Sequence, residues 1–250
     1  MTIIIKAKKI LILEIDKELK NLLKGKRVAI VGPSPHLLGK NIGPKIDEFD
    51  FVCRINNIIE TEYSADYGSK NDIIFHCCPT LWIHNFALKL ERDEETTKNI
   101  KFVVCPAIKA IHDGSGSVTE NFKNINKYNI PFWWIGQNNY WNIRNEIGVE
   151  PNSGLSSIII LLNCGIKELL ITGFSFYAQY FDNKSYDSCY YNGASYNPGN
   201  DNGIRNPHLG HPQVPQMKYI VNKLIPQHRE KIIVDSFLNE ILNLNHPKII

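Results

Sequence analysis

The sequence has no long hydrophobic run. No uninterrupted apolar stretch approaches the roughly 20 residues that a helix needs to cross a bilayer. The apolar N-terminus, MTIIIKAKKILILEIDKELK, is interrupted by Lys6, Lys8 and Lys9, which makes it a poor secretory signal. We therefore expect a soluble, cytoplasmic protein without a transmembrane segment. A peripheral membrane contact by this segment stays open, although a helix packed on the domain is the simpler account.

Neither positive nor negative charge predominates in the sequence. The 28 Lys and Arg residues nearly balance the 25 Asp and Glu residues, which leaves a formal net charge of +3. The basic side chains are scattered along the chain instead of being gathered into a patch. A nucleic-acid partner is therefore not expected, because such binders usually carry a clustered basic face.

Cysteine is present, but not in the pairs that metal sites use. The chain has six cysteines and no CxxC pair, which gives little support to a structural zinc site. Most of them lie inside apolar runs such as FVCRI, FVVCP and LLNCG, where cysteine behaves as a small buried hydrophobic residue. Free thiols in a reducing compartment are the simplest interpretation.

Short apolar runs alternate with helix-like segments along most of the chain. The predicted strands are Val28–Val31, Phe51–Cys53, Ile73–His76, Phe102–Cys105, Phe132–Ile135, Leu169–Thr172 and Ile232–Val234. The predicted helices are Glu14–Leu23, Thr80–Glu94, Ser117–Lys127, Leu155–Cys164 and Gln213–Leu224. Because the strand segments are continuously apolar, we expect burial on both faces. This predicts an α/β fold with a mostly parallel central sheet and helices on both faces.

No internal repeat and no linker divides the chain, so we expect one domain over residues 1–250. Residues 1–26 form a helical lead-in, in which Leu11–Ile15 begins a strand or a helix. Residues 182–213 are rich in Asn, Gly, Pro and Tyr and nearly empty of aliphatic side chains. A loop of that length in a compact domain is usually a lid, a binding loop or disorder. Its tyrosines argue against plain disorder, so we favour a loop that orders over a ligand.

The stretch VAIVGPSPHLLGKNIG predicts a strand that runs into a tight turn at Gly32, Pro33 and Ser34. Turns at the carboxyl end of a buried strand are where α/β proteins hold nucleotides. The turn fits neither the GxGxxG fingerprint of dinucleotide sites nor the GxxxxGK[ST] loop of ATP sites. Pro33 also lacks the backbone N–H that a phosphate would use. NAD and ATP in their usual loops are therefore not supported.

Polar residues follow or precede other expected elements. Asn56 comes after the second strand, together with Arg54, and an amide there suits the edge of a base or a ribose. Asn152, Ser153 and Gly154 come directly before a helix. Free backbone donors and the helix dipole make that position a natural anion site, although ordinary capping is the default explanation in isolation.

Two further pairs complete the set of candidate residues. Gly173 and Tyr177 follow the strand Leu169–Thr172, and His208 and His211 lie just ahead of another helix. Taken alone, the tyrosine would be a core residue and the histidines would be surface residues or, less often, zinc ligands. Taken together, three strand ends and one histidine-bearing loop are expected to converge on a single crevice.

In order along the chain, these segments resemble the motifs of the sialyltransferases. VAIVGPSPHLLGKNIGPKIDEFDFVCRIN is similar to the large motif of glycosyltransferase family 29. EPNSGLSSIIILLNCGIKELLITGFSFY is similar to the small motif of that family, and HPQVPQ to its very small motif. The bacterial family 42 sialyltransferases are echoed by GPS in the first turn, RxN after the next strand, SG at a helix start and GxxFY.

The resemblance implies a GT-A-like, Rossmann-like fold and a CMP-sugar donor. It also implies inverting transfer of sialic acid, or a relative such as Kdo, to a glycan or glycolipid hydroxyl, with no cofactor or metal. By this resemblance His211 is the general base. The implied donor contacts for the cytidine part are Gly32, Pro33, Ser34 and Asn56. Asn152, Ser153 and Gly154 would hold the ribose, phosphate or carboxylate, and Gly173 is a further donor contact. Tyr177 and Tyr186 would bond the leaving phosphate, and His208 would contact the phosphate or the acceptor.

The implied chemistry suits these residue types. A histidine has a pKa near neutrality and can take the proton of an acceptor hydroxyl. Tyrosine hydroxyls and a helix N-terminus supply donors for the charge that grows on a departing phosphate. The sequence contains no DxD and no cluster of carboxylates, which disfavours the metal-dependent nucleotide-sugar mechanism.

The chain also departs from these families, and two alternatives stay open. Pro33 or Val31 stands where both families have Asn, Glu150 where family 42 has Arg, and Gln216 where the very small motif has Glu. Cys164 fits one partner of the eukaryotic cysteine bridge, but Arg27 stands at the position of the other. One alternative is a pterin pyrophosphokinase-like diphosphotransferase, which would bind ATP and Mg²⁺. The other is a catalytically degenerate nucleotide- or glycan-binding domain.

Overall fold

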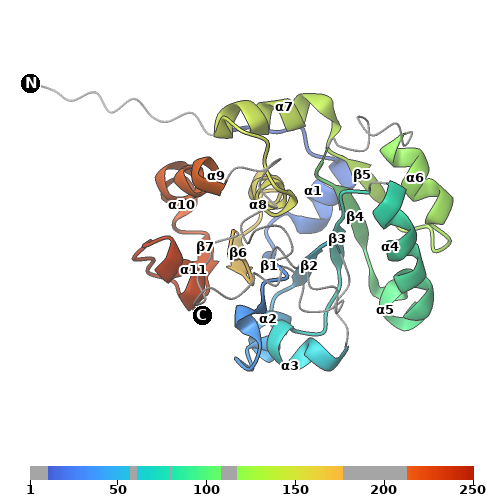
Figure 1. Cartoon of the computed structure of the whole chain (residues 1–250), viewed down its shortest axis with the longest axis horizontal. Helices are drawn as coiled ribbons and strands as arrows, with labels where there is room; N and C mark the ends of the chain where they lie inside the picture. Colours follow the sequence, from blue (N-terminus) through green and yellow to red (C-terminus); the bar gives the residue numbers. More distant parts are fainter. Residues whose placement is uncertain (1–10, 57–60, 79, 108–116, 177–212) are drawn as a thin grey trace, which may run out of the picture.

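A computed structural model describes residues 11–56, 61–78, 80–107, 117–176 and 213–250 (Figure 1). Seven strands form one sheet in the order β5-β4-β3-β2-β1-β6-β7, and every pairing within it is parallel. The strands are β1 (Arg27–Val31), β2 (Phe51–Ile55), β3 (Ile73–Phe75), β4 (Phe102–Cys105), β5 (Phe132–Trp134), β6 (Glu168–Thr172) and β7 (Ile232–Val234). All seven predicted strands are therefore confirmed, with small shifts at their ends.

Helices connect the strands and cover the sheet. They are α1 (Lys17–Leu23), α2 (Gly43–Asp47), α3 (Ser64–Tyr67), α4 (Thr80–Arg92), α5 (Glu94–Asn99), α6 (Val118–Ile125), α7 (Gly136–Ile147), α8 (Ser153–Asn163), α9 (Gln213–Tyr219), α10 (Ile225–His228) and α11 (Ser236–Ile241). A π-helical segment, η5 (Ile220–Leu224), joins α9 to α10, and η1 (Pro35–Leu37) and η2 (Thr61–Tyr63) are 3-10 turns.

Several predicted helix boundaries are wrong for reasons of capping. Residues 11–16 form no regular element, so the strand or helix start predicted at Leu11–Ile15 is absent. The first helix begins only at Lys17, because the Asp16 carboxylate accepts hydrogen bonds from the amides of the first turn. The helix predicted over Thr80–Glu94 ends at Arg92, since Asp93 caps a separate helix, α5. The last predicted helix continues beyond Leu224 through α10.

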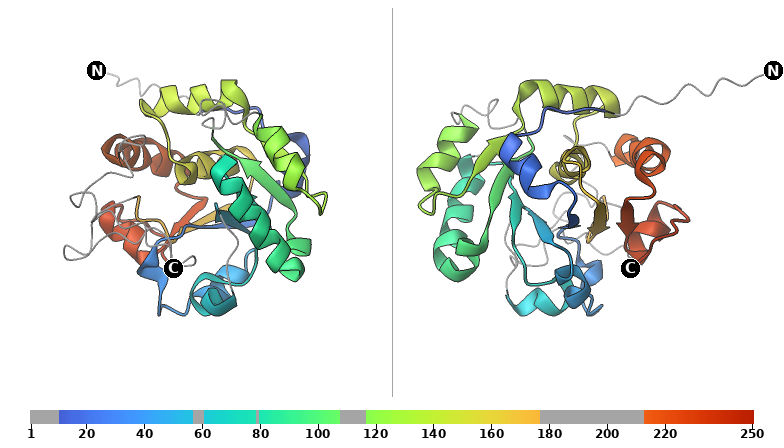
Figure 2. Two further views of the ribbon diagram at one scale, coloured as in Figure 1. Left: turned by 45° about the vertical axis from the view of Figure 1, so that its right-hand side comes forward. Right: turned by 180° about the vertical axis from the view of Figure 1, so that it is seen from behind.

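The sheet is buried on both faces, as its continuously apolar strands predict. Alternate residues of one strand enter different clusters: Val28 and Ile30 pack with α1, α7, α8 and α9, whereas Ala29 and Val31 pack beneath α2 and α3. The second face also carries α4 and α6, over β3 and β4. Figures 1 and 2 show these helices in two layers around the central sheet. The architecture is thus a three-layer α/β fold.

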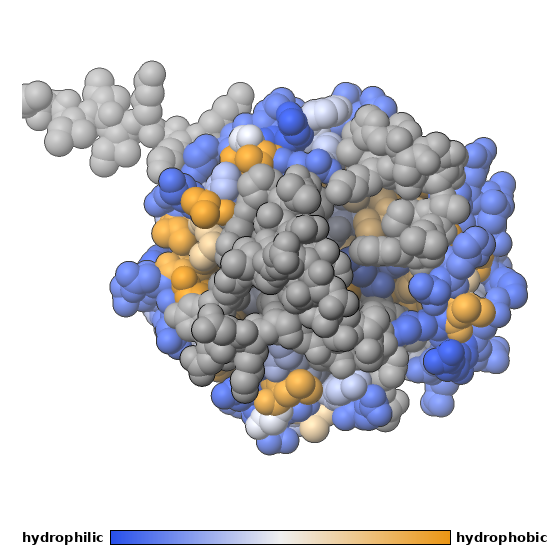
Figure 3. Space-filling view, in the orientation of Figure 1, coloured by the Kyte–Doolittle hydropathy of each residue, from blue (hydrophilic) through white to orange (hydrophobic). Residues whose placement is uncertain are grey.

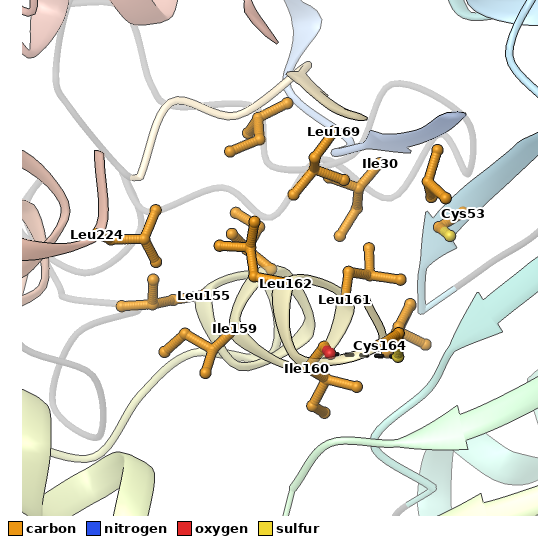
Figure 4. Close-up of a cluster of buried hydrophobic side chains, with 14 of the residues drawn as sticks. Ile30, Cys53, Leu155, Ile159, Ile160, Leu161, Leu162, Cys164, Leu169 and Leu224 are labelled. Atoms are coloured by element: carbon orange, nitrogen blue, oxygen red, sulfur yellow. Dashed lines mark hydrogen bonds between the residues drawn. The ribbon is translucent and has the colours of Figure 1, made fainter. Parts of the chain in front are cut away.

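Helix α8 is the centre of the larger core. Its residues from Gly154 to Leu162 are all buried, and Figure 4 shows Leu161 and Leu162 directed toward Ile30 and Leu169 of the central strands. The thiol of Cys164 donates to the Ile160 carbonyl at 3.3 Å. None of the described cysteines forms a disulfide. Because α8 is packed along its whole length, its N-terminus has a fixed position near the carboxyl end of β6.

None of the helices in the described ranges is long and apolar enough to cross a membrane. On the face seen in Figure 3, hydrophobic residues outside the grey segments form small groups among hydrophilic ones. The peripheral membrane contact of the N-terminal segment stays a prediction, since residues 1–10 lie outside the described part of the chain.

Acid is expected to destabilise the fold through His76, which follows β3. Burial lowers the pKa of His76 from its usual 6.5 to about 3. Between those two values the unfolded chain binds a proton that the folded protein does not. The contribution of His76 to the free energy of unfolding is therefore fully present above its pKa in the unfolded chain. It is lost as the pH falls toward its pKa in the folded protein. At about pH 5 the loss is roughly 2 kcal/mol.

The variant His76→Asn checks this expectation. Nδ1 of His76 accepts from the Cys78 amide at 3.0 Å, and an asparagine oxygen can take over that role without titrating. Losing the ring that stacks on Phe86 lowers stability at every pH. Urea unfolding at about pH 7.5 and about pH 5 measures how far the free energy of unfolding decreases between the two pH values. In the variant this decrease should be smaller than in the parent by roughly 2 kcal/mol. His228 and His246, whose pKa values burial also lowers, are present in both proteins. An equal drop in both would contradict the assignment.

Candidate functional site

The chain reverses its direction of winding between β1 and β6. From β1 it proceeds outward through β2 to β5, and it then returns to place β6 and β7 on the other side of β1. In open parallel sheets such a switch point leaves a crevice at the carboxyl ends of the two strands, where ligands bind. Gly32 directly follows β1, and Gly173 directly follows β6. Two of the predicted site residues therefore flank the switch point.

The two glycines touch each other through their backbones. The Gly32 amide donates to the Thr172 carbonyl at 2.8 Å, and the Ser34 amide donates to the Gly173 carbonyl at 2.9 Å. A Cβ on Gly32 would lie 2.4 Å from the Gly173 oxygen, and a Cβ on Gly173 would lie 2.4 Å from the Gly32 oxygen. Gly173 also has a φ of +72°. Only glycine permits this approach of the two turns.

This contact decides what the β1 turn offers to a ligand. The amides of Gly32 and Ser34 are already bonded to the β6 side, and Pro33 and Pro35 have no N–H. Residues 32–35 therefore present no free amide to a phosphate. The turn is suited to contacts through its carbonyl groups and side chains, which agrees with the failed match to the two phosphate-binding loops.

The N-terminus of α8 has unbonded backbone amides, which the β1 turn lacks. Asn152 is its N-cap: the side-chain Oδ1 accepts from the Leu155 amide at 2.8 Å, and the carbonyl accepts from the Ser156 amide. Among the described residues, the amides of Ser153 and Gly154 have no hydrogen-bond partner. Two adjacent unbonded amides at the positive end of a buried helix can donate hydrogen bonds to an anion, and the anion site itself stays a prediction.

Phe174, which was not among the predicted site residues, lies between the β1 turn and the start of α8. A Cβ on Gly154 would lie 2.6 Å from the Phe174 ring, and one on Gly32 would lie 3.0 Å from it. The ring of Phe174 also stacks on that of Phe176, with centroids 5.6 Å apart. The signal in the sequence was GFSF itself, because a buried aromatic two residues after a strand packs against whatever lies at the strand end.

Asn56 and Arg54 turn out to differ in role. Asn56 follows β2 in a left-handed conformation, with φ of +59°, and its Oδ1 accepts from the Cys77 amide at 3.3 Å. It therefore reaches the carboxyl end of β3. The expectation that Arg54 lies beyond the strand end is wrong, because Arg54 is a residue of β2 and is fully buried. Its guanidinium donates to the backbone carbonyls of the segment 67–70, a structural role.

Gln216 connects α9 to the N-terminus of α8. Its side-chain oxygen accepts from the Asn152 amide at 3.0 Å, and Gln216 is almost completely buried. The other predicted site residues, His208, His211, Tyr177 and Tyr186, lie outside the described residues, as does 182–212 of the predicted loop. Gln213, the last residue of that predicted loop, begins α9.

Gln216 is expected to act as a structural acceptor that glutamate can replace. Gln216→Leu leaves the buried Asn152 amide without a partner, which should lower the free energy of unfolding by about 1–3 kcal/mol. Gln216→Glu keeps an oxygen at the same place and should stay close to the parent. Urea denaturation of the three proteins measures the difference. Equal stability of the leucine variant and the parent would contradict the role.

The described part of the chain contains no group of three or more His, Cys, Asp or Glu side chains that could hold a metal ion. This finding concerns only the described residues. Independence from metals therefore stays a prediction.

Comparisons with known proteins find similarity to sialyltransferases. Residues 6–116 match the model of glycosyltransferase family 29 (sialyltransferase). That range contains the large motif but not the small or the very small motif. No curated protein matches the chain.

Solved structures share the fold. A mammalian sialyltransferase in complex with Gal-beta-1-3GalNAc-ortho-nitrophenol aligns with a TM-score of 0.51 and 18% identity, over 88% of this chain and 73% of that chain. A variant of the sialyltransferase Cst-II in complex with CMP aligns with a TM-score of 0.53 and 20% identity, over 90% and 86%. CstII from Campylobacter jejuni with cytidine-5'-monophosphate gives a TM-score of 0.49 and 19% identity, over 84% and 80%. The resemblance to the family 29 sialyltransferases is thus confirmed by the match of residues 6–116, and the chain shares its fold with solved sialyltransferases over the 88–90% of its length that aligns.

Proposed function

We propose that this protein is an inverting glycosyltransferase that uses a CMP-activated sugar. Its donor carries sialic acid or a related ulosonic acid such as Kdo, and its acceptor is a hydroxyl group of a glycan or glycolipid. The reaction needs no metal ion. The observation that carries the proposal is the pair of unbonded amides at Ser153 and Gly154, which lies at the switch point beside the turn of the family 29 large motif.

The charge of the donor fits this arrangement. A CMP-sugar of this class has a phosphate and a sugar carboxylate, and the N-terminus of α8 supplies two amides and a positive dipole end for one of them. Asn56, at the end of β2, offers a side-chain amide to the base or the ribose. The β1 turn, which has no free amide, supports a role in shaping the cytidine pocket instead of binding phosphate.

His211 serves as the general base in this proposal. It removes the proton of the acceptor hydroxyl while the oxygen attacks the anomeric carbon of the donor. The bond from that carbon to the phosphate oxygen breaks, and CMP leaves with the electron pair. Tyr177 and Tyr186 donate hydrogen bonds to the leaving phosphate, with His208 as a further contact to phosphate or acceptor. His211 precedes Gln213, the first residue of α9, by two positions, and α9 is bonded to α8 through Gln216.

Release of CMP tests the proposal. The purified protein is mixed with CMP-sialic acid or CMP-Kdo in the presence of EDTA and a panel of glycan acceptors, and CMP is quantified by chromatography. We expect release from at least one donor that increases with an acceptor. Stabilisation by ATP with Mg²⁺ but not by CMP would instead favour the pyrophosphokinase-like alternative. CMP binding without turnover of any donor would favour the degenerate binding domain.

A further inference from the structure

One buried carboxylate links the carboxyl ends of three strands. Asp235 follows β7, and its Oδ2 accepts from the Gly173 amide at 2.9 Å and from the Thr172 hydroxyl at 2.8 Å. Its Oδ1 accepts from the Leu238 amide and so caps α11. The carboxylate therefore holds the turn after β6 by two separate hydrogen bonds.

His36 extends this network to the turn after β1. Its Nε2 lies 3.1 Å from the Asp235 Oδ2, and its Nδ1 lies 2.9 Å from the Ser34 hydroxyl oxygen. The imidazole stacks on Phe237 with centroids 4.1 Å apart. The side chains of His36 and Asp235 are each only 4% exposed. The network thus joins the two turns that also meet through Gly32 and Gly173.

The carboxylate is kept ionised. Burial acts to raise the pKa of Asp235, but the hydrogen bond and charge of His36, with the amides of Leu238 and Gly173, outweigh it and lower the pKa. Because an ionised carboxylate only accepts, Nε2 of His36 carries the proton that faces it. Nδ1 of the same ring is hydrogen-bonded to the Ser34 hydroxyl group, which donates to it when the ring is neutral and accepts from it when the ring is protonated. The network therefore sets the direction of the Ser34 side chain as well as the place of the turns.

We propose that His36 and Asp235 are positioning residues that hold the β1 and β6 turns in the geometry that binds the CMP-sugar donor. This inference rests on the proposed function. A buried carboxylate with a polar partner contributes little to stability compared with apolar residues of the same volume, because the polar groups lose their hydration. What the pair does provide is a fixed geometry, since the Thr172 hydroxyl, the Gly173 amide and Nε2 of His36 converge on the Oδ2 atom of Asp235. Four of the proposed donor contacts, Gly32, Pro33, Ser34 and Gly173, lie in the segments that it holds.

The variant His36→Phe tests this role. Phenylalanine keeps a ring to stack on Phe237 but makes neither hydrogen bond. We expect KM for the CMP-sugar and the Kd of CMP to rise about tenfold, and kcat at saturating donor to change by less than about threefold. Asp235→Asn should act in the same direction. The double variant should be no worse than the stronger single one, because both remove the same link.

The control is Phe122→Leu, which truncates a buried ring of α6 in the separate cluster over β4. If the pair served stability alone, His36→Phe and Phe122→Leu would both reduce the active fraction and leave KM and Kd unchanged. That result would overturn the proposal.

Amide hydrogen exchange separates this inference from the proposed function. Without any nucleotide, exchange at the Ser34 and Gly173 amides should be about tenfold faster in His36→Phe than in the parent, and unchanged in Phe122→Leu. If the parent does not bind CMP, the proposed function fails and the donor part of the inference fails with it, while exchange still decides whether the pair holds the turns. If the parent binds CMP and His36→Phe binds it equally well, the positioning role fails and the proposed function stands.

Discussion

Replacing His211 by alanine is expected to slow sugar transfer by about 100- to 10,000-fold, the usual contribution of one general base. Only the chemical step should suffer, because the imidazole is assigned to the acceptor proton and not to the nucleotide. The Kd of CMP, measured by calorimetry, should therefore stay within about threefold of the parent. Initial rates at saturating donor and acceptor give the comparison of kcat.

His208 supplies the matched control for that experiment, since it is the same residue type three positions earlier in the same segment. As a phosphate or acceptor contact, His208→Ala should raise KM by more than it lowers kcat. A large loss of kcat in His208→Ala and a small one in His211→Ala would show that the two roles are reversed. Full kcat in both variants would leave the reaction without a histidine base, contrary to the proposal.

A second large effect is expected from a single methyl group at Gly32. In Gly32→Ala the added carbon would lie 2.4 Å from the Gly173 carbonyl oxygen and 2.9 Å from its carbon. Both are backbone atoms of a turn that is itself bonded to Asp235, so the neighbour cannot move aside as a flexible side chain would. We expect the free energy of unfolding to fall by about 3 kcal/mol, the upper end for overpacking a rigid site. CMP affinity should fall as well, because relieving the clash separates the two turns.

Gly39→Ala isolates the steric part of this effect. Gly39 has a φ of +75°, but a Cβ there would meet nothing within 4 Å. The cost at Gly39 is therefore backbone strain alone, about 1 kcal/mol. Urea denaturation should rank the parent above Gly39→Ala and Gly39→Ala above Gly32→Ala. A Gly32→Ala protein as stable as the Gly39→Ala protein would mean that the turns are not in backbone contact.

The strands and the main site turns were predictable, because their signals are local. Each strand is a short run of apolar residues, and in a sheet buried on both faces such a run has few other interpretations. The start of α8 was predictable too, to within two residues: Asn152 is its N-cap, Ser153 and Gly154 are its first two residues, and the structure leaves the amides of both unbonded.

Helix α7 was missed because its residues are poor helix formers by composition. Its sequence, GQNNYWNIRNEI, contains four asparagines. Its core contacts come from Tyr140, Ile143 and Ile147, which are spaced three and four residues apart. That spacing is typical of a helix with one buried face, but the polar residues between these positions made the helical pattern hard to recognise.

The network of Asp235 and His36 was out of reach for a different reason. The two residues are 199 positions apart, and neither stands in a motif that specifies the other. Their pairing depends on β7 joining the sheet beyond β6, which a list of strands does not determine. The contact between these two residues therefore follows from the order of the strands in the sheet, which the positions of the strands in the sequence do not give.

The place of β1 has a consequence for how the protein is made. β1 is paired along its whole length with β6, whose residues begin at Glu168. Until β6 has been synthesised, the side of β1 that faces away from β2 is an unpaired edge, which is able to pair with another polypeptide. The central part of the sheet is thus completed only after the last strand but one has been made.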